Sequence, residues 1–307
     1  TDLTDYQISF TLDTQSLISD GKMRDDCGDI RVKDENGQDL NYWVESGTCN
    51  TTSTKIWVKV PSIPANSTTT IYVHYGDLNL TSQSNATSTF IRIIDGVVGA
   101  WHFDEGEGST TYDSSGNDND GTIYGATWTD GKFGKALNFD GSDDYVEISN
   151  SDSLNPQQEL TITWWIYPID YPQNENRGIF KTSQYNLDLI SGKGRIEVYV
   201  DGAYRGCSNP DGVSTGVWHF IVGTYKAFED HGISKFWVDG VLKATCELTG
   251  LSTYTINTTT NSLRIGYAAA APPTHGTYDD VCIYNRALTE DEISDLYNNY
   301  SYTTENY

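Results

Sequence analysis

Carboxylates are the side chains of this sequence with the most scope for chemistry. Asp and Glu together number 43 against 19 Lys and Arg, so the net charge is −24. A hard cation such as Ca²⁺ is held by several carboxylate, amide and carbonyl oxygens. Residues near both ends of the longer half of the chain could supply such oxygens: Asp104, Glu105, Asp113, Asn117, Asp279 and Asp280. The alternative is that these are solvated loop carboxylates of a very acidic protein.

Catalytic patterns find little support in the sequence. A glycosidase needs two carboxylates that face each other across a cleft, and no expected core strand carries a Glu-x-Asp-x-x-Glu arrangement. The histidines are scattered, and no Ser or Cys has the setting of a nucleophile in a strained turn. We expect His102 and His219, which directly follow Trp residues, to be structural. We therefore interpret the protein as a non-enzyme.

Charge and composition exclude some partners and favour a secreted protein. So negative a surface repels nucleic acid and anionic lipid, and no apolar run approaches the length of a membrane-spanning helix. Abundant Tyr (21 residues), a single Met and frequent Thr, Ser, Asn and Gly are typical of a secreted all-β protein. Sequons for N-glycosylation occur at Asn50, Asn66, Asn79, Asn85, Asn257 and Asn299. We expect an extracellular or cell-surface glycoprotein.

The five cysteines favour the same compartment. None has the spacing of a metal site. Two pairs nest along the chain, Cys27 with Cys49 and Cys207 with Cys246, and each disulfide would contribute about 3–4 kcal/mol by closing a loop of the unfolded chain. The alternative is five buried thiols in a cytosolic protein, which the sequons disfavour. Cys282 is left over, as a free thiol or an intermolecular bridge.

The strand pattern predicts two β-units. Residues 1–77 contain short alternating segments separated by turn residues, which predicts a small antiparallel N-terminal sandwich. Residues 78–92 form a polar linker, residues 93–300 a larger β-unit, and residues 301–307 a polar tail. In the larger unit, alternation places one apolar set on a single face of a strand: Ile162, Trp164 and Ile166. Thr161, Thr163 and Trp165 are expected on the opposite face.

The first unit resembles an uncharacterised β-rich module that is typical of bacterial and archaeal surface proteins. The matching segments are Gly21–Arg31, Tyr42–Glu45, Ile56–Pro61 and Ile71–Gly76. The resemblance supports the pairing of Cys27 with Cys49. Members of this family usually carry another strand before the position of Tyr6. Its lack would leave backbone groups able to pair with a strand of another chain, unless the chain is simply trimmed.

Residues 93–300 resemble the laminin-G / concanavalin A-like jelly roll. The markers include Ala100–Glu105, Lys135–Ile148, Leu160–Pro168, Trp218–Tyr225, Lys235–Leu242 and Tyr278–Ile293. The resemblance implies a structural calcium that ties the first loops to the last strand, and Asp104, Asp113 and Asp279 are the expected ligands. One short C-terminal helix is predicted over Thr289–Tyr297, because Thr289 and Glu292 form a capping box. The predicted fold is all-β.

These observations favour a structural role. Our first hypothesis is a non-enzymatic glycoprotein subunit of a cell-surface fibre or layer, which binds copies of itself by strand complementation. The alternative is a carbohydrate-binding adhesin, which the jelly-roll resemblance favours, and a hydrolase is the weakest hypothesis. Glycan binding would use aromatic side chains, and those available are Tyr171, Tyr185, Tyr199, Tyr204, Trp128 and Tyr254. Each could equally be part of the packing of a Tyr-rich sandwich.

Overall fold

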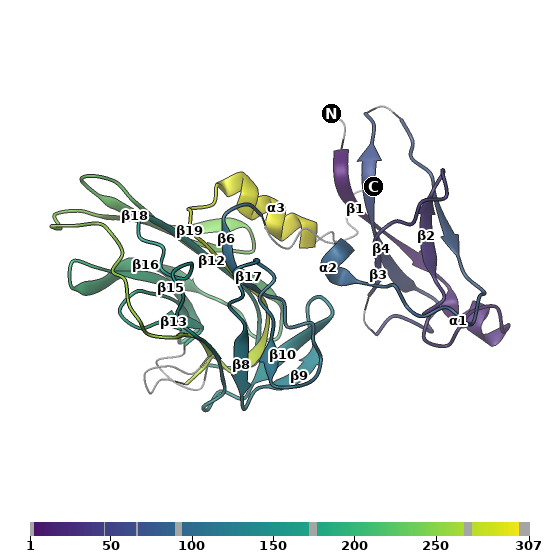
Figure 1. Cartoon of the computed structure of the whole chain (residues 1–307), viewed down its shortest axis with the longest axis horizontal. Helices are drawn as coiled ribbons and strands as arrows, with labels where there is room; N and C mark the ends of the chain where they lie inside the picture. Colours follow the sequence, from purple (N-terminus) through teal and green to yellow (C-terminus); the bar gives the residue numbers. More distant parts are fainter. Residues whose placement is uncertain are drawn as a thin grey trace. The chain divides into compact units, whose positions relative to one another are not determined.

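The structure is a computed structural model that describes residues 3–45, 47–65, 67–89, 94–171, 177–266 and 272–300 (Figure 1). Strands dominate it, which confirms the predicted all-β class. The chain divides into two compact units, the first within residues 1–92 and the second within residues 93–297. No helix in the described part of the chain is long and apolar enough to span a membrane.

The first unit is a small sandwich of two antiparallel sheets. One sheet has the order β1-β4-β3 and the other pairs β2 with β5. The elements of this unit are β1 (Leu3–Leu12), α1 (Thr14–Ser19), β2 (Arg31–Asp34), β3 (Tyr42–Val44), β4 (Thr54–Ile63), β5 (Ile71–His74) and α2 (Ala86–Thr89). Its core includes Ile30, Ile56 and Val58, which are fully buried. Strand β1 lies at the edge of its sheet in the described part of the chain.

The segment predicted as a linker is hydrogen-bonded to the first unit over residues 78–89. Arg24 donates from Nη1 to the Leu80 carbonyl at 2.8 Å, and Arg31 donates from Nη2 to the Thr81 carbonyl at 2.7 Å. The Val44 backbone N–H donates to Ser84 Oγ at 2.8 Å. Because its carbonyls and hydroxyls already have partners, this stretch is part of the unit up to residue 89. Residues 90–93 lie outside the described residues.

The second unit is a jelly roll of two large antiparallel sheets, as predicted. One has the order β19-β18-β17-β12-β21-β10-β9, with β6 also on β21. Its strands are β6 (Val97–Trp101), β9 (Thr127–Asp130), β10 (Lys135–Phe139), β12 (Glu159–Pro168), β17 (His219–Ala227), β18 (Gly232–Val238), β19 (Val241–Leu248) and β21 (Gly276–Tyr284). The other has the order β16-β15-β14-β13-β20-β11-β8-β7. Its strands are β7 (Thr110–Thr111), β8 (Gly121–Tyr124), β11 (Tyr145–Ile148), β13 (Ile179–Lys181), β14 (Tyr185–Ile190), β15 (Lys193–Val200), β16 (Ala203–Gly212) and β20 (Leu263–Gly266).

Strand β12 illustrates how the core forms. Ile162, Trp164 and Ile166 point into the space between the sheets and are fully buried, as the alternation predicted. Trp165 points the other way, yet it is only 1% exposed. The rings of Phe220 and Phe133 pack against it at 5.1 and 5.9 Å. Helix α3 (Glu290–Tyr300, yellow in Figure 1) adds Tyr297, whose ring stacks on Trp165 at 6.0 Å. The Thr289–Glu292 capping box is confirmed, since the Thr289 N–H donates to Glu292 Oε2 at 2.8 Å.

Both predicted disulfides are present. Cys27 and Cys49 are joined within the first unit, and Cys207 is joined to Cys246 in the second. Cys207 lies on β16 and Cys246 on β19, which are the end strands of the two sheets. This bond therefore ties the two sheets together at one open side of the sandwich. Cys282 is a buried free thiol.

Candidate functional site

Two of the predicted calcium ligands hold the loop between β9 and β10. Asp104 accepts a hydrogen bond at Oδ1 from the Lys135 N–H at 3.0 Å. Asp279 accepts one at Oδ2 from the Phe133 N–H, also at 3.0 Å. The carboxylates thus approach the same loop from two places, Asp104 from the segment after β6 and Asp279 from β21. Their bonds to backbone donors explain why acidic residues are useful at these two positions.

The third predicted ligand, Asp113, organises its own loop. It accepts hydrogen bonds from the backbone N–H groups of Ala100, Ser115 and Asn119 at 2.8, 2.9 and 3.0 Å. Among the described residues, a different set of carboxylates lies close enough to share a cation: Asp140, Asp143 and Asp144 each place an oxygen within 4.8 Å of the others. The signal for it was present in the run Asp140-Gly-Ser-Asp-Asp144. Calcium binding at Asp104, Asp113 and Asp279 stays a prediction.

The predicted glycosylation sites lie at the surface wherever their side chains are described. Four Asn side chains are exposed: Asn50, Asn79, Asn85 and Asn257. Asn66 and the side chain of Asn299 lie outside the described residues. Their use as glycosylation sites stays a prediction.

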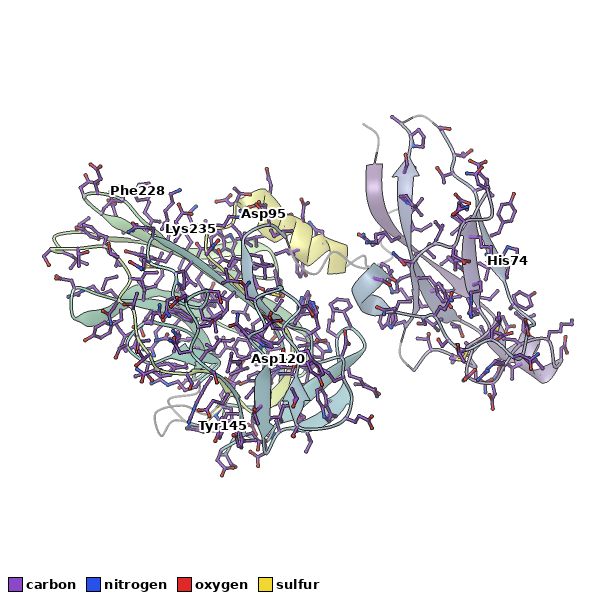
Figure 2. The ribbon with its side chains drawn as sticks, in the orientation of Figure 1. His74, Asp95, Asp120, Tyr145, Phe228 and Lys235 are labelled. Carbon is purple, nitrogen blue, oxygen red and sulfur yellow. A yellow bond between two sulfur atoms is a disulfide. The ribbon has the colours of Figure 1, made fainter. Side chains whose placement is uncertain are left out.

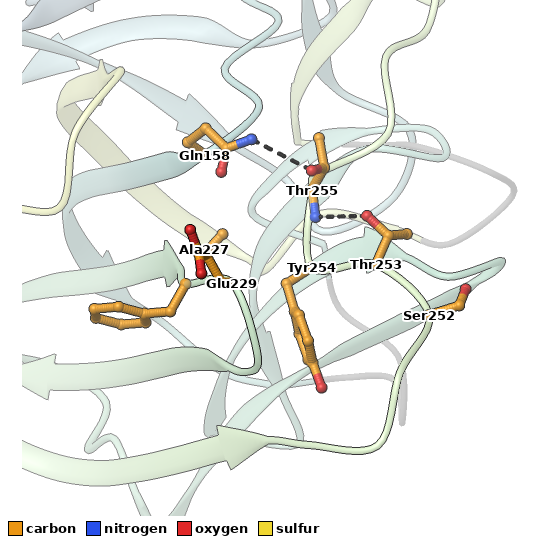
Figure 3. Close-up of a pocket in the computed structure, with 8 residues that line it drawn as sticks. Gln158, Ala227, Glu229, Ser252, Thr253, Tyr254 and Thr255 are labelled. Atoms are coloured by element: carbon orange, nitrogen blue, oxygen red, sulfur yellow. Dashed lines mark hydrogen bonds between the residues drawn. The ribbon is translucent and has the colours of Figure 1, made fainter.

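A cleft of about 380 Å³ lies at one end of the second unit (Figure 3). Its lining comes from three places: the end of β17 and the turn that follows it, the residue before β12, and the segment after β19. The lining residues are Gln158, Ala227, Phe228, Glu229, Ser252, Thr253, Tyr254 and Thr255. The volume is at the small end of ligand pockets, which span about 300–1,000 Å³. Of the six aromatic residues named from the sequence, Tyr254 alone is among these lining residues.

Hydrogen bonds fix the segments that form the cleft. The Ala227 N–H donates to the Gln158 carbonyl at 2.8 Å, which continues the pairing of β12 with β17. Gln158 Nε2 donates to Thr255 Oγ1 at 3.3 Å, as Figure 3 shows. The Tyr225 hydroxyl donates to the Tyr254 carbonyl at 2.6 Å, and burial raises the pKa of Tyr225 to about 12. The cleft is therefore largely formed before any ligand arrives.

Phe228 gives the cleft an exposed aromatic ring. It is 40% exposed, and the His231 ring stacks on it at 4.4 Å with an angle of 7° between the planes. His231 Nδ1 lies 2.6 Å from Asp230 Oδ1, and this hydrogen bond lowers the pKa of the Asp230 carboxyl. An apolar ring beside hydroxyl, amide and carboxylate groups can bind a molecule with both C–H and O–H surfaces.

A second aromatic surface lies on the outer face of the other sheet. Tyr124 on β8 is directly opposite Tyr145 on β11, and their rings stack at 4.6 Å. The Arg264 guanidinium lies 4.5 Å from the Tyr145 ring and bonds to Glu147 at 3.0 Å. Figure 2 labels Phe228 and Tyr145 far apart in the second unit. The two aromatic surfaces are therefore separate.

The carboxylates of this outer face are paired with arginines. Asp188 on β14 is fully buried and lies 2.9 Å from Arg177 and 3.4 Å from Arg195. Arg195 also lies 3.2 Å from Glu197 on the neighbouring strand. Burial raises the pKa of Asp188, and the two guanidinium groups act against that rise. Carboxylates held in this way are not poised as the acid and base of a glycosidase.

One arrangement escaped the sequence reasoning. Ser214 Oγ lies 2.8 Å from His219 Nε2, and His219 Nδ1 lies 2.7 Å from Asp239 Oδ2. This is the order of a nucleophile, a base and an orienting acid. Asp239 lies in the tight turn between β18 and β19 with φ of 53°, and its Oδ1 accepts the Phe220 N–H at 2.8 Å. The His219–Asp239 contact therefore has a structural purpose, because it ties β17 to this turn.

Solved structures show where this fold occurs. The binding domain of Paraclostridial Mosquitocidal Protein 1 is 16% identical with a TM-score of 0.54, and the match covers 67% of this chain and 52% of that one. The botulinum neurotoxin serotype D binding domain is 15% identical with a TM-score of 0.53, covering 66% and 52%. This chain thus spans about half the length of these toxin domains. No curated protein matches it.

A third structure is matched almost over its full length. It is Domain 4 of AbnA, a GH43 extracellular arabinanase from Geobacillus stearothermophilus, in complex with arabinotriose. It is 21% identical to this chain with a TM-score of 0.50, and the match covers 65% of this chain and 97% of that domain. At such identities these likenesses show the fold alone.

Family models match both units. Residues 26–124 match a domain of unknown function, DUF2341, which agrees with the uncharacterised module expected from the sequence. Residues 140–294, just over half of the 307 residues, match the model described as the concanavalin A-like lectin/glucanases superfamily. The chain belongs to the concanavalin A-like lectin/glucanases superfamily.

Proposed function

We propose that this chain is a non-catalytic saccharide-binding protein of the extracellular space or cell surface, and that the cleft beside Phe228 is its binding site. The observation that carries the proposal is the composition of this cleft. One exposed aromatic ring lies beside the amide of Gln158, the carboxylate of Glu229 and the hydroxyls of Ser252, Thr253 and Thr255. A sugar presents a C–H face to an aromatic ring and hydroxyls to groups of these kinds.

The polar groups can accept and donate at fixed positions. The Glu229 carboxylate is an acceptor with two oxygens, and an amide such as Gln158 offers both an acceptor and two donors. Gln158 and Thr255 are already bonded to each other, so they orient each other toward the cleft. Such pre-formed polar groups lose less side-chain entropy when a ligand binds.

The comparisons support this proposal better than the fibre subunit that the sequence favoured. Similar structures include toxin binding domains and a domain whose solved structure contains arabinotriose. The edge position of β1 is compatible with strand addition, but nothing identifies a second copy of the chain as its partner. The two disulfides favour an oxidising compartment, which supports the proposed location.

Absence of catalysis is part of the same proposal. The Asp188 and Glu197 carboxylates are paired with arginines, and the His219–Asp239 contact fixes a turn. A glycosidase would instead need two carboxyls that face each other across a bound substrate, whereas Asp188 is fully buried and owes its raised pKa to that burial. We therefore expect no turnover of a bound polysaccharide.

Calorimetric titration with soluble arabinan, galactan, mannan and β-glucan tests the proposal. Binding of at least one of them, weakened about 5–30-fold in Phe228→Ala, is expected because an aromatic contact of this kind is worth about 1–2 kcal/mol. Tyr112→Ala is the matched control, since Tyr112 is 60% exposed and does not line the cleft. No binding to any of the four, or equal losses in both variants, would contradict the proposal.

A further inference from the structure

The charge around the cleft is predominantly negative. Glu229 belongs to the lining, and Asp230 follows it in the same turn. Asp201 accepts a hydrogen bond from the hydroxyl of Ser252, which is also a lining residue. Glu159 follows the lining residue Gln158, but its carboxylate is paired with Lys226 and accepts the Ala287 N–H at 2.9 Å, so it adds no free charge to the cleft. Glu229, Asp230 and Asp201, which come from two turns, thus place three carboxylates at a cleft of about 380 Å³.

A cation next to the lining is already neutralised. Lys226 precedes the lining residue Ala227, and its Nζ lies 2.8 Å from Glu159 Oε1. The same Nζ lies 5.6 Å from the Phe228 ring. His231 is hydrogen-bonded to Asp230. A ligand carboxylate would have to compete with Glu159 for Lys226 and would gain little from His231.

We propose that the cleft accepts uncharged sugars and rejects sugars that carry carboxylate or sulfate groups. This inference rests on the proposed saccharide binding at the same site. The hydroxyls of a neutral sugar can donate hydrogen bonds to the carboxylates at the cleft. An ionised carboxylate can only accept hydrogen bonds, and those that it accepts are strong. An acidic sugar cannot donate from its ionised group, and it meets like charges on several sides.

The preference for neutral over acidic sugars has two physical sources. Two like charges about 5 Å apart in water change an equilibrium about fourfold, and more where the cleft excludes water. The net charge of −24 adds a long-range repulsion of any anion. Both contributions are screened by salt over a length of about 8–10 Å at physiological ionic strength. The preference should therefore shrink as salt is added.

The experiment compares each polysaccharide with its own acidic derivative. Arabinan, galactan, mannan and β-glucan are titrated before and after carboxymethylation of their hydroxyl groups, with the wild-type chain and with Glu229→Gln. Glu107→Gln is the matched control, because it removes the same charge from an exposed residue that does not line the cleft. The readout is the ratio of the affinities for the neutral and acidic forms.

The expected ratio favours the neutral form of whichever polysaccharide binds. Glu229→Gln should reduce that ratio about fourfold, whereas Glu107→Gln should leave it unchanged. If the acidic form binds as tightly as the neutral form, or more tightly, the inference is wrong while saccharide binding stands. If neither form of any of the four binds, the proposed function fails and this inference fails with it.

Discussion

Loss of the Cys207–Cys246 disulfide should destabilise the second unit and leave the first unit unaffected. The bond spans 39 residues of sequence and joins the end strands of the two sheets. Closing a loop of that length in the unfolded chain corresponds to about 4 kcal/mol in the chain-entropy estimate. For a unit of this size, 1 kcal/mol shifts Tm by about 2–4 °C. The double variant Cys207→Ala/Cys246→Ala should therefore lose about 8–16 °C in the unfolding transition of the second unit.

Differential scanning calorimetry measures this loss in Tm, because it separates the unfolding transitions of the two units. The matched control is Cys27→Ala/Cys49→Ala, which removes a bond across 22 residues in the first unit. It should lower the other transition, by a free energy of about 3–4 kcal/mol. A shift below about 2 °C for Cys207→Ala/Cys246→Ala, or an equal shift of both transitions, would refute the account of how the sheets are tied together.

Three further perturbations have definite outcomes. Addition of Ca²⁺ should raise Tm if calcium binds as predicted, and this rise should disappear in Asp104→Asn. If the rise disappears instead in Asp143→Asn, the cluster of Asp140, Asp143 and Asp144 is the site. No rise in Tm at all would contradict calcium binding. Arg286 lowers the pKa of Glu292 to about 2, so the pair stabilises the fold fully above the ordinary Glu pKa near 4.5. Its contribution should be lost as pH falls from 4.5 toward 2. Acid unfolding monitored by circular dichroism should show this dependence of stability on pH in the wild-type chain and lose it in Glu292→Gln. Asp188→Asn should cost about 3–5 kcal/mol in urea unfolding, because Arg177 and Arg195 would lose their buried counter-charge; an unchanged midpoint would show that the pair is dispensable.

The architecture could be predicted from local patterns. Alternation in β12 identified the inward face of Ile162, Trp164 and Ile166, because a strand repeats every two residues. The same pattern could not show that Trp165 is buried as well. That depends on rings that are distant in sequence, Phe133, Phe220 and Tyr297, of which Tyr297 is 132 positions away and reaches Trp165 through the packing of α3.

The candidate site was beyond the reach of such patterns. Its lining comes from residues 158, 227–229 and 252–255. Pairing of β12 with β17 brings the first two together, and the hydrogen bonds of Tyr225 with Tyr254 and of Gln158 with Thr255 add the third. Phe228 looks like any other aromatic residue in the sequence, and its exposure follows from its place in the turn after β17. Tyr185, in contrast, was named as a possible sugar contact and is fully buried in the core. Burial distinguishes the two, and no local signal encodes it.

Amide chemical shifts measured during titration with a neutral oligosaccharide test the central claim most directly. The residues that line the cleft are known, so the response can be mapped without any variant. Binding at the cleft predicts that the largest changes fall on residues 227–231 and 252–255. Changes centred on the Tyr124–Tyr145 stack, or no changes at all with oligomers of arabinose, galactose, mannose and glucose, would contradict the account.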